Sequence, residues 1–251
     1  MIARSSVAVR PALIASREPT GETLAPAGDA HGALERACDA ARLPLPLPSR
    51  TAWAASALSD AAVVVAVRDR GGRVLAASAV DLTPTRALPG HFIARVQRLG
   101  ANVREDAAEV FVRQLVAWSR NHPRVLRLHV EVMAPDPGLR AALESTLARH
   151  AFATAALPRR YARTVLLDLV PAPDAIFAGL HKTARQNVRA VAKRPLRVAP
   201  VVDGALAARL AALEAETMGR TGGGYQGVDW ARLIALSTAH PPLSRGAGWW
   251  R

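Results

Sequence analysis

Cysteine and lysine are nearly absent from this sequence of 251 residues. Cys38 is the single cysteine, which excludes an intrachain disulfide and any metal site built from cysteines, so a reducing compartment is expected. Tyr and Phe are also scarce. The two Tyr and four Phe offer few rings on which the bases of single-stranded nucleic acid could stack. This scarcity weakens an interpretation of the chain as a single-strand binding protein.

Long apolar segments are missing as well. The best apolar run, Ala61 to Val67, is far shorter than the roughly 20 residues that span a bilayer. Arginines interrupt the N-terminal region, which therefore lacks the apolar core of roughly 7–15 residues of a signal peptide. The sequence contains no Walker loop, no zinc-ligand spacing and no G-x-S-x-G elbow. We predict a soluble, cytoplasmic protein with no stable membrane insertion and no bound cofactor.

Positive charge is abundant. The 33 basic residues exceed the 20 acidic ones and give a formal net charge of +13, with a pI near 11.5. Such an excess favours a polyanionic partner, either nucleic acid or a phosphorylated substrate. A composition rich in Ala and Arg and poor in Lys is also typical of a GC-rich genome, so part of this bias carries no functional information.

The order of apolar patterns predicts a mixed α/β fold. Two strands at Ala61–Val67 and Arg73–Asp81 flank a turn with two glycines and form a hairpin. A strand, a helix, a strand and a helix follow, and the next two strands are predicted as a pair. The predicted ranges are His91–Leu99, Asp106–Arg120, Val125–Met133, Pro137–His150, Ala151–Leu157 and Tyr161–Leu169. Earlier in the chain, residues 1–32 are predicted to be a loose tail, with one short strand at Ser6–Ile14.

The segment Asp174–Arg194 is predicted to be one amphipathic helix that organises the second half of the chain. Its apolar residues recur at three- and four-residue steps and are expected to be buried, namely Phe177, Leu180, Ala184, Val188 and Val191. Four cations follow the same steps and are aimed away from the core, namely Lys182, Arg185, Arg189 and Lys193. This stripe is either a solvated charged face or a site for a diphosphate, a phosphate backbone or an acidic patch.

After this helix the pattern predicts a strand at Leu196–Val202, a helix at Gly204–Gly219 and a short helix at Asp229–Ser237. The Gly-rich segment Thr221–Gly227 follows a helix, so it is better suited to end that helix than to cradle a phosphate. The end of the chain, His240–Arg251, shows neither the apolar period of a helix nor that of a strand.

Two further segments are candidates for chemistry. On the predicted strand Val125–Met133, Arg127, His129 and Glu131 share one face, where His129 and Glu131 could act as a general base and its partner if the face lined a cleft. A solvated or helix-covered face is the alternative. The segment Gln97–Asn102, QRLGAN, resembles the Q/R-x-x-G-x-G/A loop with which acetyltransferases bind the coenzyme A pyrophosphate, although Asn102 replaces the last small residue. A simple strand-to-helix turn would also explain it.

From about Tyr161 to Gly223 the chain resembles the FemAB-like branch of the GNAT superfamily, the peptidoglycan aminoacyltransferases and their acetyltransferase relatives. The matching sequence is a strand that ends in Leu-Leu-Asp-Leu, the basic helix, the strand Leu196-Arg197-Val198 and a helix that closes on Thr217 and Arg220. The preceding region matches in the order of its elements. The resemblance implies two GNAT-like domains, each with a mixed, largely antiparallel sheet flanked by helices. Their boundaries are predicted as a tail at 1–32, a first domain at 33–172 and a partial second domain at 173–251.

The resemblance also implies a function. Relatives transfer an aminoacyl group from charged tRNA, or another activated acyl group such as that of acyl-CoA, to an amine of a cell-wall precursor or similar acceptor. Lys182, Arg185, Arg189, Lys193 and Arg220 would bind the acceptor diphosphate or the tRNA backbone; no DNA partner and no catalytic residue are assigned. Because 173–251 is short for a whole domain, an incomplete C-terminus is expected, which would leave this chain alone inactive. Two alternatives stay open, an acetyl-CoA-dependent N-acetyltransferase and a non-catalytic basic protein that binds RNA or nucleotides.

Overall fold

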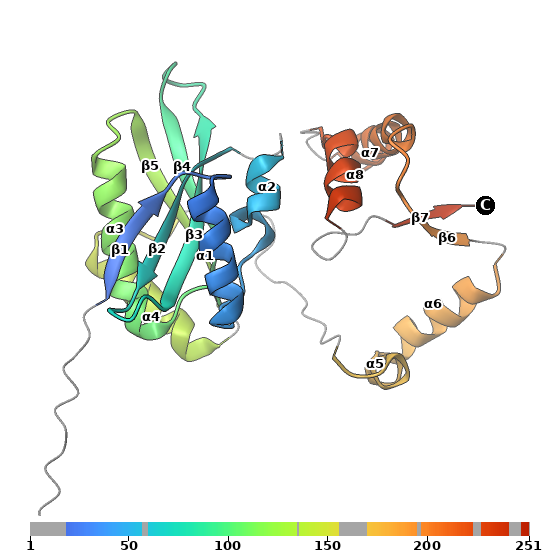
Figure 1. The fold of residues 1–251 in the computed structure, drawn as a ribbon. Coiled ribbons are helices and arrows are strands. Elements are labelled where there is room, and N and C mark those ends of the chain that lie inside the picture. The colour runs from blue at the N-terminus through green and yellow to red at the C-terminus, as the bar shows by residue number, and fades with distance from the viewer. Residues whose placement is uncertain are drawn as a thin grey trace, which may run out of the picture. The chain divides into compact units, whose positions relative to one another are not determined.

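The computed structural model describes residues 19–56, 60–134, 136–155, 170–194, 197–222, 227–240 and 247–250 (Figure 1). The chain divides into two compact units. The first comprises Met1–Ala55 and Ser59–Phe152, and the second comprises Ser56–Leu58 and Ala153–Arg251. Within the described ranges, none of the helices combines the length and the apolar character that crossing a membrane requires.

The first unit is built on a sheet of five strands in the order β1-β2-β3-β4-β5. The strands are Thr20–Leu24, Ala61–Arg68, Val74–Pro84, Phe92–Gly100 and Val125–Met133. Neighbouring strands are antiparallel except β4 and β5, which are parallel. A parallel pair needs a crossover, and helix α3, Ala108–Arg120, supplies it. The predicted α/β class with a mixed, largely antiparallel sheet is confirmed.

Helices cover both faces of this sheet (Figure 1). On one face, α1 (Asp29–Ala40) packs Leu34 and Cys38 against Val64 and Ala66 of β2. On the other face, α3 and α4 (Pro137–Arg149) cover a larger apolar cluster that includes Phe111. Three short elements complete the described part of the unit: η1 (Leu47–Ser49), α2 (Thr51–Ala55) and η2 (Glu105–Ala107).

Local sequence explains the two sharpest junctions of this unit. Asp69 closes the β2–β3 hairpin, because its Oδ1 accepts hydrogen bonds from the backbone N–H groups of Gly71 and Arg73 at 2.8 and 3.0 Å. Gly72 adopts a left-handed backbone there, with φ of 79°. At the start of α4, the carboxylate of Asp136 accepts from two backbone N–H groups of the first turn. The predicted hairpin and the predicted N-terminus of this helix are confirmed.

The second unit contains α5 (Pro173–Gly179), α6 (Lys182–Ala192), β6 (Arg197–Pro200), α7 (Leu206–Thr221), α8 (Trp230–Ala239) and β7 (Ala247–Trp250). Helices α7 and α8 are joined by a hydrogen bond of 2.9 Å from the indole Nε1 of Trp230 to Oε2 of Glu214. Gly222 ends α7 in a left-handed conformation with φ of 66°, as predicted for the Gly-rich segment.

The structure corrects two predictions about the ends of the chain. Residues 19–32 are not a loose tail, because β1 pairs with β2 along its length and α1 begins at Asp29. Arg68 of β2 binds Glu22 of β1 at 2.6 Å, which holds this polar edge strand in register. The C-terminal segment, for which no helix or strand is predicted, contains β7. This strand pairs antiparallel with β6, and Trp250 lies opposite Arg197.

Other predicted strands fall largely on residues that the structure does not describe. The strand predicted at Ser6–Ile14 and the strand at Tyr161–Leu169 lie outside the described residues. Of the strand predicted at Ala151–Leu157, only 151–155 are described, and they contain no strand.

Candidate functional site

The basic segment 174–194 forms two helices rather than the predicted single one. Helix α5 ends at Gly179, Leu180 is extended with ψ of 149°, and α6 begins after His181, whose side chain accepts from the backbone N–H of Thr183. Arg185 stabilises the joint, because its Nη1 donates to the carbonyl oxygens of Ala178 and Leu180 at 2.8 and 2.6 Å. Carbonyl groups at a helix end lack partners within the helix, and this guanidinium supplies one.

The four predicted cations therefore differ in their burial and in their contacts. Arg185 is half-buried in the joint, and the guanidinium carbon of Arg189 lies 5.3 Å from the ring centre of Phe177. Lys182 and Lys193 are exposed. The prediction that all four cations point away from the core is wrong for Arg185, which binds the end of α5. Arg189 is exposed, as predicted, although its guanidinium lies over an aromatic ring.

The apolar face predicted for this segment is not buried. Val188 is 50% exposed, and the described side chains of Phe177, Leu180, Ala184 and Val191 are only half-buried. The break at Leu180 separates Phe177 on α5 from Ala184, Val188 and Val191 on α6, so the five side chains do not form one continuous stripe. Arg220 lies exposed in the last turn of α7, and no hydrogen bond or ion pair among the described residues joins it to α6.

Gln97–Gly100 of the QRLGAN segment form the end of β4, and Ala101 and Asn102 lead from this strand toward η2 and α3, with several polar groups of the segment already hydrogen-bonded. The backbone N–H of Gly100 donates to Oδ1 of Asn102 at 2.9 Å, and Nδ2 of Asn102 donates to the carbonyl of Ala77 at 2.8 Å. The N–H groups of Val103 and Arg104 also donate to backbone carbonyls. Asn102 is buried, so its side chain closes the loop from within.

Packing also explains the glycine of this segment. A Cβ at Gly100 would lie 2.3 Å from the carbonyl oxygen of Met133 and 2.8 Å from Cα of Ala134, both backbone atoms of the segment that contains and follows β5. Gly100 thus allows close approach of its own chain and is not needed for close approach of a ligand. A phosphate oxygen bound at the N–H of Gly100 would have to displace the side chain of Asn102.

A different cluster appears on the sheet face opposite α3 and α4. Asp81 of β3 lies directly across from Arg95 of β4, and Arg95 lies across from His129 of β5. The alternating neighbours Val80, Ala94, Val96, Leu128 and Val130 belong to the core on the other face. Side chains alternate between faces along a strand, so Asp81, Arg95 and His129 share the second face. We call these three residues the polar row; Gln97 and Glu131 follow it on the same face.

The polar row is buried at one end and exposed at the other. Asp81 is 7% exposed and His129 is exposed, with Arg95 between them. Nε2 of Gln97 donates to Oδ2 of Asp81 at 2.7 Å. The second oxygen of this carboxylate, Oδ1, has no hydrogen-bond partner among the described residues, and neither does the buried Nε of Arg95. Leaving a buried polar group unpaired costs about 1–3 kcal/mol, so these two atoms require an explanation.

The electrostatics of Asp81 suit a proton acceptor. Burial raises the pKa of this carboxyl above its ordinary value, and the nearby carboxylate of Asp60 adds to the increase. The hydrogen bond from Gln97 and the charge of Arg95 lower the pKa but do not cancel the effect of burial. The sequence pattern identifies the face of His129 and Glu131 but misses Asp81 and Arg95, which join it through the pairing of β3, β4 and β5.

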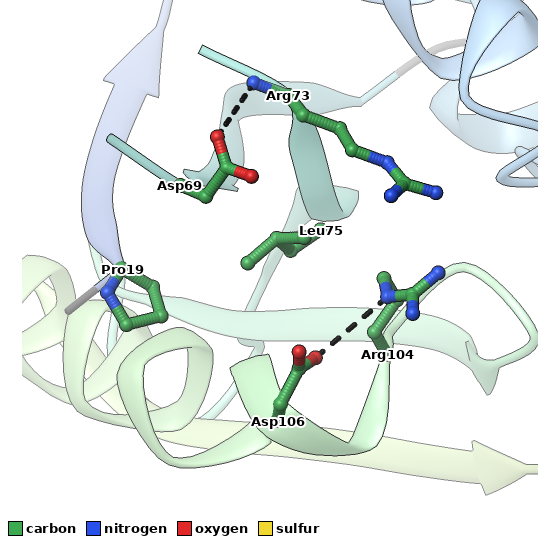
Figure 2. A pocket seen from close by; sticks show the side chains of 6 residues that line it. All are labelled: Pro19, Asp69, Arg73, Leu75, Arg104 and Asp106. Carbon is green, nitrogen blue, oxygen red and sulfur yellow. Dashed lines mark hydrogen bonds and ion pairs between the residues drawn. The ribbon is translucent and has the colours of Figure 1, made fainter. Parts of the chain in front are cut away.

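A cavity of about 290 Å³ lies between the β2–β3 turn and η2 (Figure 2). It is lined by Pro19, Asp69, Arg73, Leu75, Arg104 and Asp106. Figure 2 shows the guanidinium groups of Arg73 and Arg104 extending toward the same side of this cavity. Two carboxylates balance them, and that of Asp69 already holds the turn. The polar row therefore remains the stronger candidate site.

Comparisons with known proteins do not assign the chain to a family. A scan against protein-family models and searches of curated proteins and of solved structures found no match.

Proposed function

We propose that the chain is an N-acyltransferase of the FemAB-like type, which transfers an aminoacyl or other activated acyl group to an amine. The polar row is the observation that carries this proposal. An amine attacks an acyl carbon only after it loses a proton, and a buried carboxylate with a raised pKa can accept that proton. The mixed sheet with its parallel β4–β5 pair, and the place of QRLGAN at the end of β4 before α3, support the GNAT-like fold that the resemblance implies.

In the proposed reaction, the amine nitrogen forms a bond to the acyl carbon and the bond from that carbon to the leaving oxygen breaks. Asp81 takes the proton that the amine loses, and the leaving oxygen gains one. Arg95 stands across from Asp81 in the sheet register, and its guanidinium stabilises the negative charge that develops on the acyl oxygen.

The closed QRLGAN loop favours an aminoacyl donor, such as charged tRNA, over acetyl-CoA. Its glycine N–H is occupied by Asn102, so the loop offers a pyrophosphate fewer donors than an open loop would. The exposed Lys182 and Lys193 are the best candidates for contact with a phosphate backbone or with the diphosphate of a cell-wall precursor. An acetyl-CoA-dependent enzyme and a non-catalytic RNA-binding protein are the competing functions.

The test combines turnover with salt-dependent binding. Aminoacyl-tRNA and acetyl-CoA are each offered with an amine acceptor, and acyl transfer is followed for the full chain and for Asp81→Asn. Transfer from aminoacyl-tRNA that Asp81→Asn reduces at least a hundredfold supports the proposal, because a positioned base contributes about 10²–10⁴-fold. Transfer only from acetyl-CoA, or full turnover by the variant, refutes it.

Binding of tRNA is then measured over a range of salt concentrations. The double variant Lys182→Gln/Lys193→Gln should reduce the slope of log K against log salt by about two, roughly one for each phosphate that is no longer neutralised. Arg185 is left intact, because its removal would disturb the joint between α5 and α6. Arg113→Gln/Arg120→Gln, two exposed positions on α3, removes the same charge from another surface and should change the slope little. Equal effects of both double variants would show that net charge alone drives binding.

A further inference from the structure

The unpaired atoms of the polar row are complementary. Oδ1 of Asp81 can only accept a hydrogen bond, and Nε–H of Arg95 can only donate one. Both atoms are buried, and the two residues lie directly opposite each other on antiparallel strands. Side chains at such positions start from Cβ atoms about 4.5–5.5 Å apart, so one compact molecule can reach both.

We propose that Asp81 and Arg95 together bind a small head group in which an amine stands next to a carbonyl, as in an α-amino acid amide or the N-terminus of a peptide. The amine donates to Oδ1 of Asp81 and the carbonyl oxygen accepts from Nε of Arg95. This inference rests on the proposed acyl transfer, for which it names the class of acceptor, since the bound amine lies beside the carboxylate that takes its proton.

Three features of the row favour such a ligand over an isolated amine or an isolated anion. A simple amine would satisfy Asp81 and leave Arg95 unpaired, and a simple carboxylate would do the reverse while facing the charge of Asp81. The other oxygen of Asp81 accepts from Gln97 at 2.7 Å, which fixes the carboxylate and leaves Oδ1 as its buried oxygen without a partner among the described residues. A site with two fixed, buried polar groups rejects ligands that leave one of them unpaired.

The test measures binding in the absence of any acyl donor. The Nε–H signals of arginine are resolved in ¹H–¹⁵N spectra, and the signal of Arg95 is assigned from its absence in Arg95→Met. The full chain is titrated with three probes of similar size: L-alaninamide, which carries the amine and the carbonyl; ethylamine, which carries the amine only; and acetamide, which carries the carbonyl only. We expect L-alaninamide to shift the Arg95 Nε–H signal saturably and to bind at least tenfold more tightly than either partial probe.

Matched variants separate recognition from folding. Asp81→Asn preserves the shape of the side chain and should lower the affinity for L-alaninamide at least tenfold. Asp106→Asn, at an exposed carboxylate of η2, should leave this affinity unchanged. No saturable shift with L-alaninamide, or equal affinity for ethylamine, overturns the inference and leaves a bridging water as the occupant of the pair. Selective binding without acyl transfer from aminoacyl-tRNA would instead retain this site and refute the proposed function.

Discussion

Gly100→Ala tests whether the glycine of QRLGAN serves the sheet or a ligand. The added Cβ would lie 2.3 Å from the carbonyl oxygen of Met133 and 2.7 Å from its carbonyl carbon. Backbone atoms cannot rotate away as a flexible side chain can, so β4 and β5 must separate locally. Overpacking of a core costs about 1–3 kcal/mol, and a clash between two backbones belongs at the upper end of this range. We therefore expect a decrease of about 3 kcal/mol in the free energy of unfolding.

Urea denaturation followed by circular dichroism measures this decrease, and Gly32→Ala is its matched control. Gly32 lies inside α1 of the same unit, where a Cβ would approach no atom closer than 3.6 Å. Alanine in a helix interior is favoured over glycine by about 0.5–1 kcal/mol, so this control should stabilise the chain. The same Gly→Ala substitution should thus lower the free energy of unfolding at Gly100 and raise it at Gly32. Gly100→Ala with unchanged stability would refute the packing argument and make Gly100 a candidate for ligand binding again.

Three titratable groups give further predictions. For Asp81, a pKa raised by burial means that the folded state holds the proton more tightly than the unfolded state, so stability falls as pH rises above the ordinary Asp pKa of about 4. Asp81→Asn should therefore gain stability relative to the natural chain as pH rises above about 4 in urea titrations. For Glu35, burial raises the pKa, but hydrogen bonds from Thr51 and Arg50 outweigh it and lower the pKa overall. Its contribution is therefore lost as pH falls, and Glu35→Gln should destabilise the chain by about 2 kcal/mol near pH 7 and by less in acid, again in urea titrations. Burial raises the pKa of Cys38 to about 11, so a thiol reagent should modify this residue only at the rate of unfolding; modification of the folded chain within minutes would contradict this.

Much of the first unit could be predicted because local chemistry determines it. Asp69 and the two glycines after Arg70 define a hairpin whatever the rest of the chain does, and Asp136 marks the start of a helix in the same way. The strand β1 could not be predicted, because its sequence, TGETL, has no apolar alternation. Its pairing depends on β2, which lies almost forty residues further along the chain. Information of this kind is not contained in a local window.

The apolar spacing does not predict the break between α5 and α6, for a related reason. Leu180 has the spacing of an apolar residue in a continuous helix, and no proline or second glycine marks the stop. The joint is stabilised by Arg185, which the same periodicity assigned to an outward-facing stripe. A long side chain can turn back onto the preceding helix end, so spacing alone cannot decide whether an arginine is available to a ligand.

The candidate site shows the same limit. Alternation along β5 places His129 and Glu131 on one face, and this much follows from sequence. Which residues of β3 and β4 join them depends on register, since a shift by one residue would exchange Asp81 for Val80.

One irregularity in β4 connects the polar row with the closed loop. The pairing of β4 with β5 shifts between Val96 and Leu99, and Arg98 within this shift has a left-handed φ of 54°. Before the shift, Arg95 faces the polar side while Val96 packs in the core; within it, Gln97 still reaches Asp81, and after it Leu99 is in the core. The change of phase therefore ends the polar face at Gln97 and sends Gly100 directly against the backbone of Met133. The same strand thus carries Arg95 of the proposed acceptor site and, just past its irregularity, the glycine whose N–H binds the side chain of Asn102.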